Sequence, residues 1–111
     1  MRKINEIFYS LQGEGRNTGM AAVFVRFSGC NLRCSFCDTD HESGSMMSDE
    51  QIVAEVKKYP QAAIVVLTGG EPSLFIDYDF VARLKKETGM KIAIETNGTH
   101  PLPDNLDWVT I

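Results

Sequence analysis

Apolar residues are gathered along this chain into short runs that are separated by segments of helical periodicity. Residues 21–27 and 62–67 form nearly continuous apolar runs, interrupted only by Arg26. Runs of this length without polar alternation are typical of strands that are buried on both faces of a sheet. A third strand is predicted over residues 91–95, so the pattern indicates a sheet that lies inside a hydrophobic core.

Two helices are predicted between these strands. Residues 48–51 have the form of a capping box, after which apolar residues recur at helical spacing until Pro60. Asp77 is the expected N-cap of the second helix, which ends at Gly89. The order strand, helix, strand, helix, strand predicts an α/β protein with right-handed crossovers and a parallel sheet.

Three other segments flank this series. Residues 4–11 mix β-branched and aromatic side chains and predict a short strand that leads into a glycine-rich loop. Residues 41–47 have no period, so we expect a loop in which His41 and both methionines face solvent. Residues 108–111 have the pattern of the first residues of a further strand, which extends the predicted sheet.

Composition and charge bound the class of protein. The chain has 111 residues, of which 43% are hydrophobic and 23% charged, as in ordinary folded domains. It is far shorter than the ~250 residues of a complete (β/α)8 barrel, so we expect one domain and an incomplete or smaller barrel. The net charge of −4 offers no general attraction to nucleic acid or to an anionic membrane, and no apolar run of about 18 residues predicts a membrane span.

Three cysteines, Cys30, Cys34 and Cys37, lie within one short segment directly after the first buried strand. Disulfides use thiols in pairs and a closed structural zinc site uses four ligands, so three thiols leave an odd cysteine or an incomplete metal sphere. A 4Fe–4S cluster held by three thiolates would keep one iron open to an outside ligand. Free clustered thiols also favour a reducing cytoplasm.

Glycines and polar residues follow the predicted strands. Gly69–Pro72 comes after the second buried strand and Glu95–Thr99 after the third, at the edge where parallel sheets place their sites. Arg26 interrupts the first strand. It is expected either to form an ion pair with Glu14 or Asp38, or to point into a barrel and bind a carboxylate with its planar guanidinium.

The spacing Cys-x3-Cys-x2-Cys, followed by Asp38 and Thr39, resembles the cluster loop of the radical S-adenosylmethionine (SAM) enzymes. Together with Gly13–Gly15, Gly69–Pro72 and Glu95–Thr99, it resembles one branch of them, the 7-carboxy-7-deazaguanine synthases. The resemblance implies a partial (β/α) barrel of the radical SAM type. Residues 1–111 would then be a single radical SAM core domain that is incomplete at its C-terminus, because members of the family continue well beyond this point.

The resemblance also implies a role for each motif. The three cysteines would hold the 4Fe–4S cluster and take part in catalysis, and Thr39 would be a ligand of Mg²⁺, to which a hydroxyl oxygen is suited. Contacts to SAM are implied for Phe36, Cys37, Asp38, Gly69, Gly70 and Glu71. Contacts to the substrate, 6-carboxy-5,6,7,8-tetrahydropterin, are implied for Leu11, Gln12, Gly13, Glu14, Arg26 and Thr68.

Local sequence alone leaves simpler roles open for several of these residues. Gly69–Pro72 also fits a tight strand-to-helix turn, and the Thr39 hydroxyl also fits the cap of a loop turn. Phe36 would then only shield the cluster from solvent. Glu95 and Glu14 are candidates for contacts to ring nitrogens or for proton transfer, and equally for salt bridges.

The implied reaction is a radical ring contraction of the pterin with loss of ammonia, which gives 7-carboxy-7-deazaguanine for 7-deazapurines such as queuosine. An electron donor such as flavodoxin or ferredoxin and a homodimer in the cytoplasm are expected. We expect the 111-residue chain by itself to associate and to be weakly active, because an incomplete barrel leaves a strand edge exposed. Two alternatives stay open: an activase of glycyl-radical enzymes, and an inactive iron–sulfur or metal-binding barrel fragment.

Overall fold

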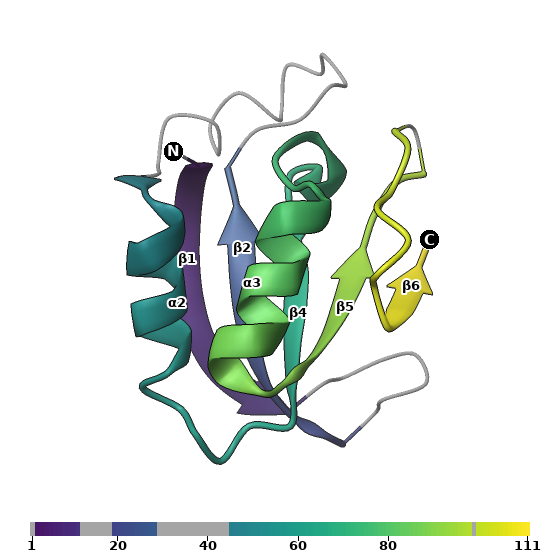
Figure 1. Cartoon of the computed structure of the whole chain (residues 1–111). Coiled ribbons are helices and arrows are strands. Elements are labelled where there is room, and N and C mark those ends of the chain that lie inside the picture. The colour runs from purple at the N-terminus through teal and green to yellow at the C-terminus, as the bar shows by residue number, and fades with distance from the viewer. Residues whose placement is uncertain (1, 12–18, 29–44, 99) are drawn as a thin grey trace.

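The computed structural model describes residues 2–11, 19–28, 45–98 and 100–111. The strands in these ranges form one six-stranded sheet in the order β3-β1-β2-β4-β5-β6. Helices α2 and α3 lie side by side across one face of this sheet (Figure 1). No helix in the described ranges is long and apolar enough to cross a bilayer. The strands are β1 (Arg2–Leu11), β2 (Ala21–Phe27), β3 (Ser45–Met47), β4 (Ile64–Gly69), β5 (Lys91–Glu95) and β6 (Trp108–Thr110).

Four of the strands, β2, β4, β5 and β6, are parallel neighbours. Helix α2 (Asp49–Val56) lies between β2 and β4 in the chain, and the short 3-10 helix η2 (Pro72–Leu74) and helix α3 (Tyr78–Thr88) connect β4 to β5. The predicted series of strands and crossover helices is therefore confirmed, as is the strand that begins at Trp108. All four parallel strands end at the same edge, the upper edge in Figure 1.

The N-terminal part of the sheet differs from the predicted all-parallel arrangement. β1 pairs with β2 in the antiparallel direction, and β3 pairs with the beginning of β1. The prediction of a loop over residues 41–47 is wrong at Ser45–Met47, which form β3. Residues 41–44 lie outside the described part of the chain. Met46 is exposed as expected, but Met47 packs against the core. Because β3 has only three residues and pairs along one edge, it carries no alternating pattern that could identify it.

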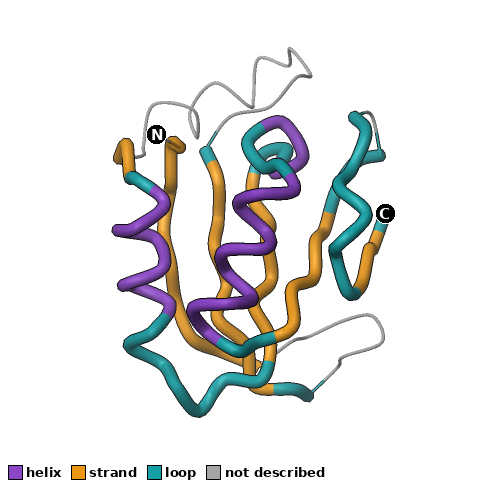
Figure 2. Tube along the Cα trace, viewed as in Figure 1, coloured by secondary structure: helices purple, strands orange, loops and turns teal. Residues whose placement is uncertain are grey.

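The sheet has two chemically different faces because side chains alternate along each strand. Val23, Val25 and Phe27 belong to the main core, under the two helices. Ala22 and Phe24 point to the opposite face, where they cluster with Ile64, Val66 and Ala93. We call this second side the open face, because neither α2 nor α3 covers it (Figure 2).

Local signals in the sequence explain where the helices begin and end. Ser48 and Gln51 form the expected capping box of α2. Asp77 caps α3 by accepting a hydrogen bond from the Phe80 N–H at 2.8 Å, and Gly89 ends the helix with φ of 69°, which favours glycine. The predicted beginnings of both helices and the end of α3 are thus confirmed, whereas α2 ends at Val56 and not at the predicted Pro60.

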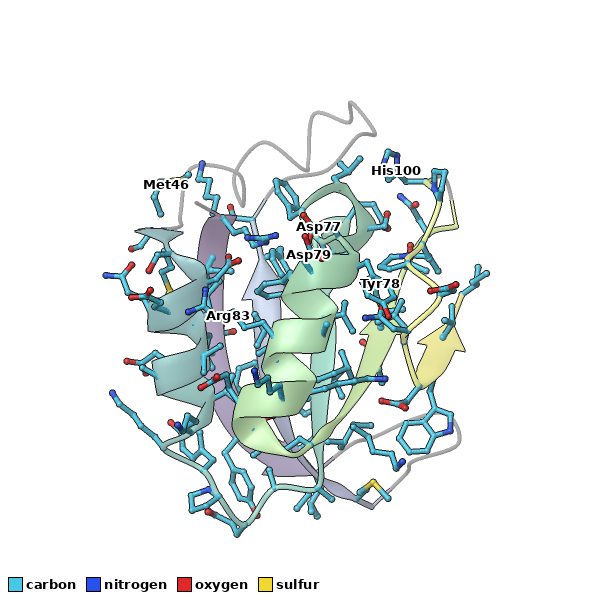
Figure 3. The ribbon with its side chains drawn as sticks, viewed as in Figure 1. Met46, Asp77, Tyr78, Asp79, Arg83 and His100 are labelled. Atoms are coloured by element: carbon cyan, nitrogen blue, oxygen red, sulfur yellow. The ribbon has the colours of Figure 1, made fainter. Side chains whose placement is uncertain are left out.

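Arg2 fastens β1 to both helices. Its guanidinium forms ion pairs with Asp49 and Asp77, donates to the Phe75 carbonyl at 2.6 Å and lies 4.2 Å from the centroid of the Phe80 ring. Figure 3 shows Asp77 at the end of α3 that adjoins the carboxyl ends of the parallel strands. The reversed strand β1 is therefore tied to the layer of helices at the same edge of the sheet.

Candidate functional site

Three polar side chains stand in a row on the open face, at the ends of three neighbouring strands. Arg26 of β2 is opposite Thr68 of β4 in the parallel register. The register of Leu67 with Ile94 then places Thr68 beside Glu95 of β5. Arg26, Thr68 and Glu95 therefore form one polar row, next to the apolar cluster of the same face.

Contacts within the row fix the orientation of two of its members. The Thr68 hydroxyl donates a hydrogen bond to Oε1 of Glu95 at 3.0 Å. Both side chains are partly buried, so solvent weakens this bond less than it would at a fully exposed site. The sequence suggested a substrate contact for Thr68 and proton transfer for Glu95, and the structure brings the two together.

Arg26 interacts with β1 through one edge of its guanidinium. Its Nε lies 3.5 Å from a carboxylate oxygen of Glu6, and its Cζ lies 5.8 Å from the centroid of the Phe8 ring. Glu14 and Asp38, the partners expected from sequence, lie outside the described residues. Glu6 was missed because only the antiparallel register of β1 with β2 places it opposite Arg26.

Gly69 lies where β4 passes close to the end of β2. A Cβ atom at this position would be 2.2 Å from the carbonyl oxygen of Phe27, and the φ of Gly69 is 113°. The next residue, Gly70, donates its N–H to the same Phe27 oxygen at 3.1 Å. Both glycines are exposed, so their backbone is accessible at the strand ends. Glycine at position 69 is required by the fold itself, besides any contact to a ligand.

Glu71 points inward and is fully buried. Its carboxylate accepts hydrogen bonds from the backbone and hydroxyl of Ser73, from the Thr96 hydroxyl and from the backbone N–H of Asn97. Burial raises the pKa of this carboxyl, but the donors, Asn97 first and then Ser73 and Thr96, outweigh burial and leave the pKa below its ordinary value. Glu71 is therefore an ionised internal group. Its carboxylate oxygens face Ser73, Thr96 and Asn97, and the contact to SAM implied for Glu71 stays a prediction.

The segment after β5 completes this arrangement. The buried Thr96 hydroxyl donates to Glu71 and accepts from the Gly98 N–H at 3.2 Å, while the Thr96 N–H donates to the Thr110 carbonyl of β6 at 2.9 Å. Sequence reasoning singled out the Glu95–Thr99 motif but gave Thr96 and Asn97 no role. The sequence held part of the information about Thr96, since a threonine in a turn after a buried strand is suited to forming hydrogen bonds with nearby backbone groups.

Leu11 does not join the polar row. It pairs with Ala21 at the beginning of β2, five residues from Arg26, which is about 17 Å along an extended strand. Its side chain is exposed and alternates onto the face opposite that of Ser10 and Ala22. A contact of Leu11 with the same ligand as Arg26 therefore stays a prediction, to which the geometry of β1 gives no support.

The remaining predicted site residues lie outside the described part of the chain. Their segments adjoin described strands: β1 ends at Leu11, just before Gln12, and β2 ends at Phe27, three positions before Cys30. Their roles in binding the cluster, SAM, Mg²⁺ or substrate stay predictions. They are Gln12, Gly13, Glu14, Cys30, Cys34, Phe36, Cys37, Asp38 and Thr39.

Comparison with known proteins gives a consistent family. The chain is 67% identical to a 7-carboxy-7-deazaguanine synthase of Bacteroides thetaiotaomicron over 99% of its own length and 59% of that protein. It is 46% identical to the enzyme of the same name from Neisseria meningitidis, over 96% of the chain and 50% of that protein. The chain thus spans between half and three fifths of the length of these curated relatives.

A solved structure resembles the whole described fold. The crystal structure of QueE from Escherichia coli superimposes with a TM-score of 0.83 at 32% identity, and the match covers 99% of this chain and 58% of that one. The predicted fold class, an α/β partial barrel of the radical SAM type, is therefore confirmed, with the antiparallel β1 and β3 as additions. Because the superfamily model also matches residues 24–109, from within β2 to within β6, the chain belongs to the radical SAM superfamily.

Proposed function

We propose that this protein is a radical SAM enzyme that converts 6-carboxy-5,6,7,8-tetrahydropterin into 7-carboxy-7-deazaguanine with loss of one ammonia. The observation that carries the proposal is the polar row of Arg26, Thr68 and Glu95 on the open face. Its cation, hydroxyl and carboxylate match the carboxylate and the ring nitrogens of such a substrate. The names of the relatives support the same reaction.

The residues of the chain fit the cofactors of the superfamily. Three cysteines supply the thiolate ligands that an iron–sulfur cluster takes, and in the sequence they come after β2, the strand that carries Arg26 of the polar row. Gly69 and Gly70 offer exposed backbone at the same edge, without side chains that would obstruct the methionine end of SAM. When bound, the cluster and SAM supply the one-electron chemistry that removes a hydrogen atom from the substrate.

The side chains of the polar row have separable tasks. Arg26 binds the substrate carboxylate with the amino groups that it does not direct at Glu6. Thr68 contacts the ring edge, and Glu95, oriented by Thr68, binds a ring nitrogen or transfers a proton. The apolar residues of the open face, Phe24 and Val66 among them, lower the local dielectric beside these groups and strengthen the contacts.

The finer parts of the proposal rest on the family resemblance. Thr39 would contribute an oxygen to Mg²⁺, and the electron would come from a flavodoxin or a ferredoxin. We propose a cytoplasmic homodimer, in which residues 1–111 form a single radical SAM core domain. The glycyl-radical activase and the inactive fragment are the alternatives that the experiment below distinguishes.

The test is a product assay on the protein that carries this chain, reconstituted anaerobically with iron and sulfide. With SAM, a reductant and the pterin, we expect 7-carboxy-7-deazaguanine by mass spectrometry and about one 4Fe–4S cluster per chain. Cys34→Ala should remove the charge-transfer absorbance of the cluster and the product together. A cluster that remains intact in Cys34→Ala, or SAM cleavage without conversion of the pterin, would contradict the proposal.

A further inference from the structure

We propose that Glu71 is a positioning residue that holds the backbone after β4 and the backbone after β5 together. It thereby sets the position of the Gly69–Gly70 backbone, beside which SAM binds in the proposed function. The second half of this proposal rests on the proposed function, because SAM binding is part of it. The first half concerns only this chain, and it can be tested without SAM. The Glu71 carboxylate accepts four hydrogen bonds, two from Ser73 on one segment and two from Thr96 and Asn97 on the other.

The donors are divided between the two carboxylate oxygens. Oε1 accepts the Asn97 N–H at 2.6 Å, and Oε2 accepts the Ser73 N–H at 3.1 Å. The hydroxyls of Ser73 and Thr96 also donate to Oε2. Each oxygen thus receives one backbone N–H, and those two N–H groups belong to segments that are 24 residues apart in sequence, at Ser73 and Asn97.

This division requires an ionised carboxylate and excludes the neutral amide of the same shape. A hydroxyl can rotate and accept a hydrogen bond, but a backbone N–H can only donate. If glutamine replaced Glu71, its oxygen could accept from one backbone N–H while its NH₂ group would face the other. A donor would then meet a donor inside the protein, and a buried unsatisfied N–H destabilises the arrangement that contains it.

The bridge lies directly beside the two exposed glycines. Gly70 precedes Glu71 and is fixed on its other side by its bond to the Phe27 carbonyl of β2. Gly69 lies so close to the Phe27 backbone that a Cβ atom would not fit between them. The Gly69–Gly70 backbone is therefore held between the end of β2 and the buried carboxylate, which in turn holds the end of β5. Displacement of the carboxylate would move the glycine backbone relative to Asn97.

The side chain of Glu71 acts through other residues and does not itself contact SAM. Its exposed fraction is 0%, and its oxygens point at Ser73, Thr96 and Asn97. A direct ligand of the SAM amino group would have to turn away from these donors. That would leave the backbone N–H groups without partners, at a cost comparable to the hydrogen bond gained.

The experiment uses Glu71→Gln in the reconstituted, SAM-free protein, with hydrogen–deuterium exchange of peptides that cover residues 69–74 and 96–98. We expect exchange to accelerate about 10-fold or more in both segments, which corresponds to ~1.4 kcal/mol of lost local stability. Glu50→Gln is the matched control: it makes the same chemical change on α2, where the Glu50 side chain is 81% exposed. Exchange in this control should equal that of the wild type.

Calorimetric titration with SAM tests the second half of the proposal. Glu71→Gln should raise the dissociation constant about 10-fold or more while the iron content stays at the wild-type level. Faster exchange confined to residues 69–74, with 96–98 unchanged, would overturn the bridge. Unchanged affinity for SAM in the presence of accelerated exchange would overturn the positioning role. A wild-type protein that binds no SAM would instead overturn the proposed function, and the exchange data would still decide the bridge.

A second variant keeps the test decisive if Glu71→Gln does not fold. Thr96→Val removes one donor to Glu71 on the β5 side, together with the acceptor of the Gly98 N–H, and leaves the carboxylate and its two backbone N–H donors in place. Because the bridge transmits the change, we expect faster exchange at residues 71–74, although the substitution lies 25 positions away from Glu71 in sequence. Exchange at 71–74 that equals the wild type would overturn the proposal.

Discussion

Thr68 donates its only hydroxyl proton to Glu95, across 3.0 Å between the ends of β4 and β5. A threonine hydroxyl has one proton and two acceptor lone pairs. While this bond persists, Thr68 can therefore accept a hydrogen bond from a ligand but cannot donate one. The proposed substrate has N–H groups along its ring edge that meet this requirement.

The role of Thr68 can be tested with a pair of substitutions. Thr68→Val keeps the shape of the side chain but loses the acceptor, and it removes the hydrogen bond that Thr68 donates to Glu95. We expect substrate affinity to fall about 10-fold, since a neutral hydrogen bond contributes about 1 kcal/mol and Glu95 also loses the hydrogen bond that orients it towards Thr68. Thr68→Ser retains the hydroxyl and should bind nearly as the wild type in calorimetry. Equal substrate affinity of Thr68→Val and the wild type would show that Thr68 does not contact the substrate.

Arg26 provides a second test of the polar row. Arg26→Lys keeps the positive charge but loses the planar fork that matches a carboxylate. We expect substrate binding to weaken while the affinity for SAM is retained, as measured by separate titrations. Unchanged substrate affinity would assign Arg26 to its ion pair with Glu6 instead. Glu6→Gln, which removes that partner and keeps Arg26, should have the smaller effect, because both side chains of the pair are about half exposed.

Gly69 should tolerate no side chain, for a reason that is independent of any ligand. In Gly69→Ala the new Cβ would meet the Phe27 carbonyl oxygen at 2.2 Å, and backbone atoms cannot move aside as a flexible side chain can. We expect a loss of more than about 2 kcal/mol in the free energy of unfolding. Gly19→Ala is the control, because Gly19 has φ of 86° but no atom within 4 Å of the added Cβ. Its cost should be about 1 kcal/mol, that of the left-handed backbone alone.

Stability should fall in acid through Glu71. Its pKa is lowered in the folded protein, so the unfolded chain binds a proton more readily than the folded one. This contribution is present above the ordinary glutamate pKa of about 4.3 and is lost as the pH falls through the lower folded value. Thermal unfolding from pH 6 downwards should therefore show a shallower loss of stability in Glu71→Gln than in the wild type. Thr96→Val, with one donor fewer, should be intermediate, and identical slopes in all three proteins would contradict the assignment.

Local sequence was sufficient for the elements whose signals are local. Ser48, Gln51 and Asp77 cap their helices by bonds to residues three positions away, so the sequence alone identifies them. The apolar runs at β2 and β4 likewise reflect burial on both faces. The positions of Arg26, Thr68 and Glu95 at strand ends followed from the same pattern, because parallel strands end at one edge.

What could not be predicted depends on partners that are distant in sequence. Glu6 meets Arg26 only because β1 runs antiparallel to β2, and a βαβ pattern contains no information about a strand that precedes it. The direction of the Glu71 side chain is likewise invisible in a Gly-Gly-Glu-Pro turn, since its donors include Thr96 and Asn97, beyond the next helix. Leu11 follows β1 to the far end of the sheet for the same topological reason.

The end of β2 is clamped from both sides by backbone alone. Ser28 donates to the Lys3 carbonyl of β1 at 3.0 Å, and the Phe27 carbonyl accepts from Gly70 after β4 at 3.1 Å. Neither bond involves a thiol or a metal, so the starting point of the cysteine segment is set by the sheet before any iron is bound. A cluster bound as proposed would therefore follow a strand that the sheet already holds in place. In the proposed enzyme, loss of the cluster would then leave the end of β2 attached to both of its neighbouring strands.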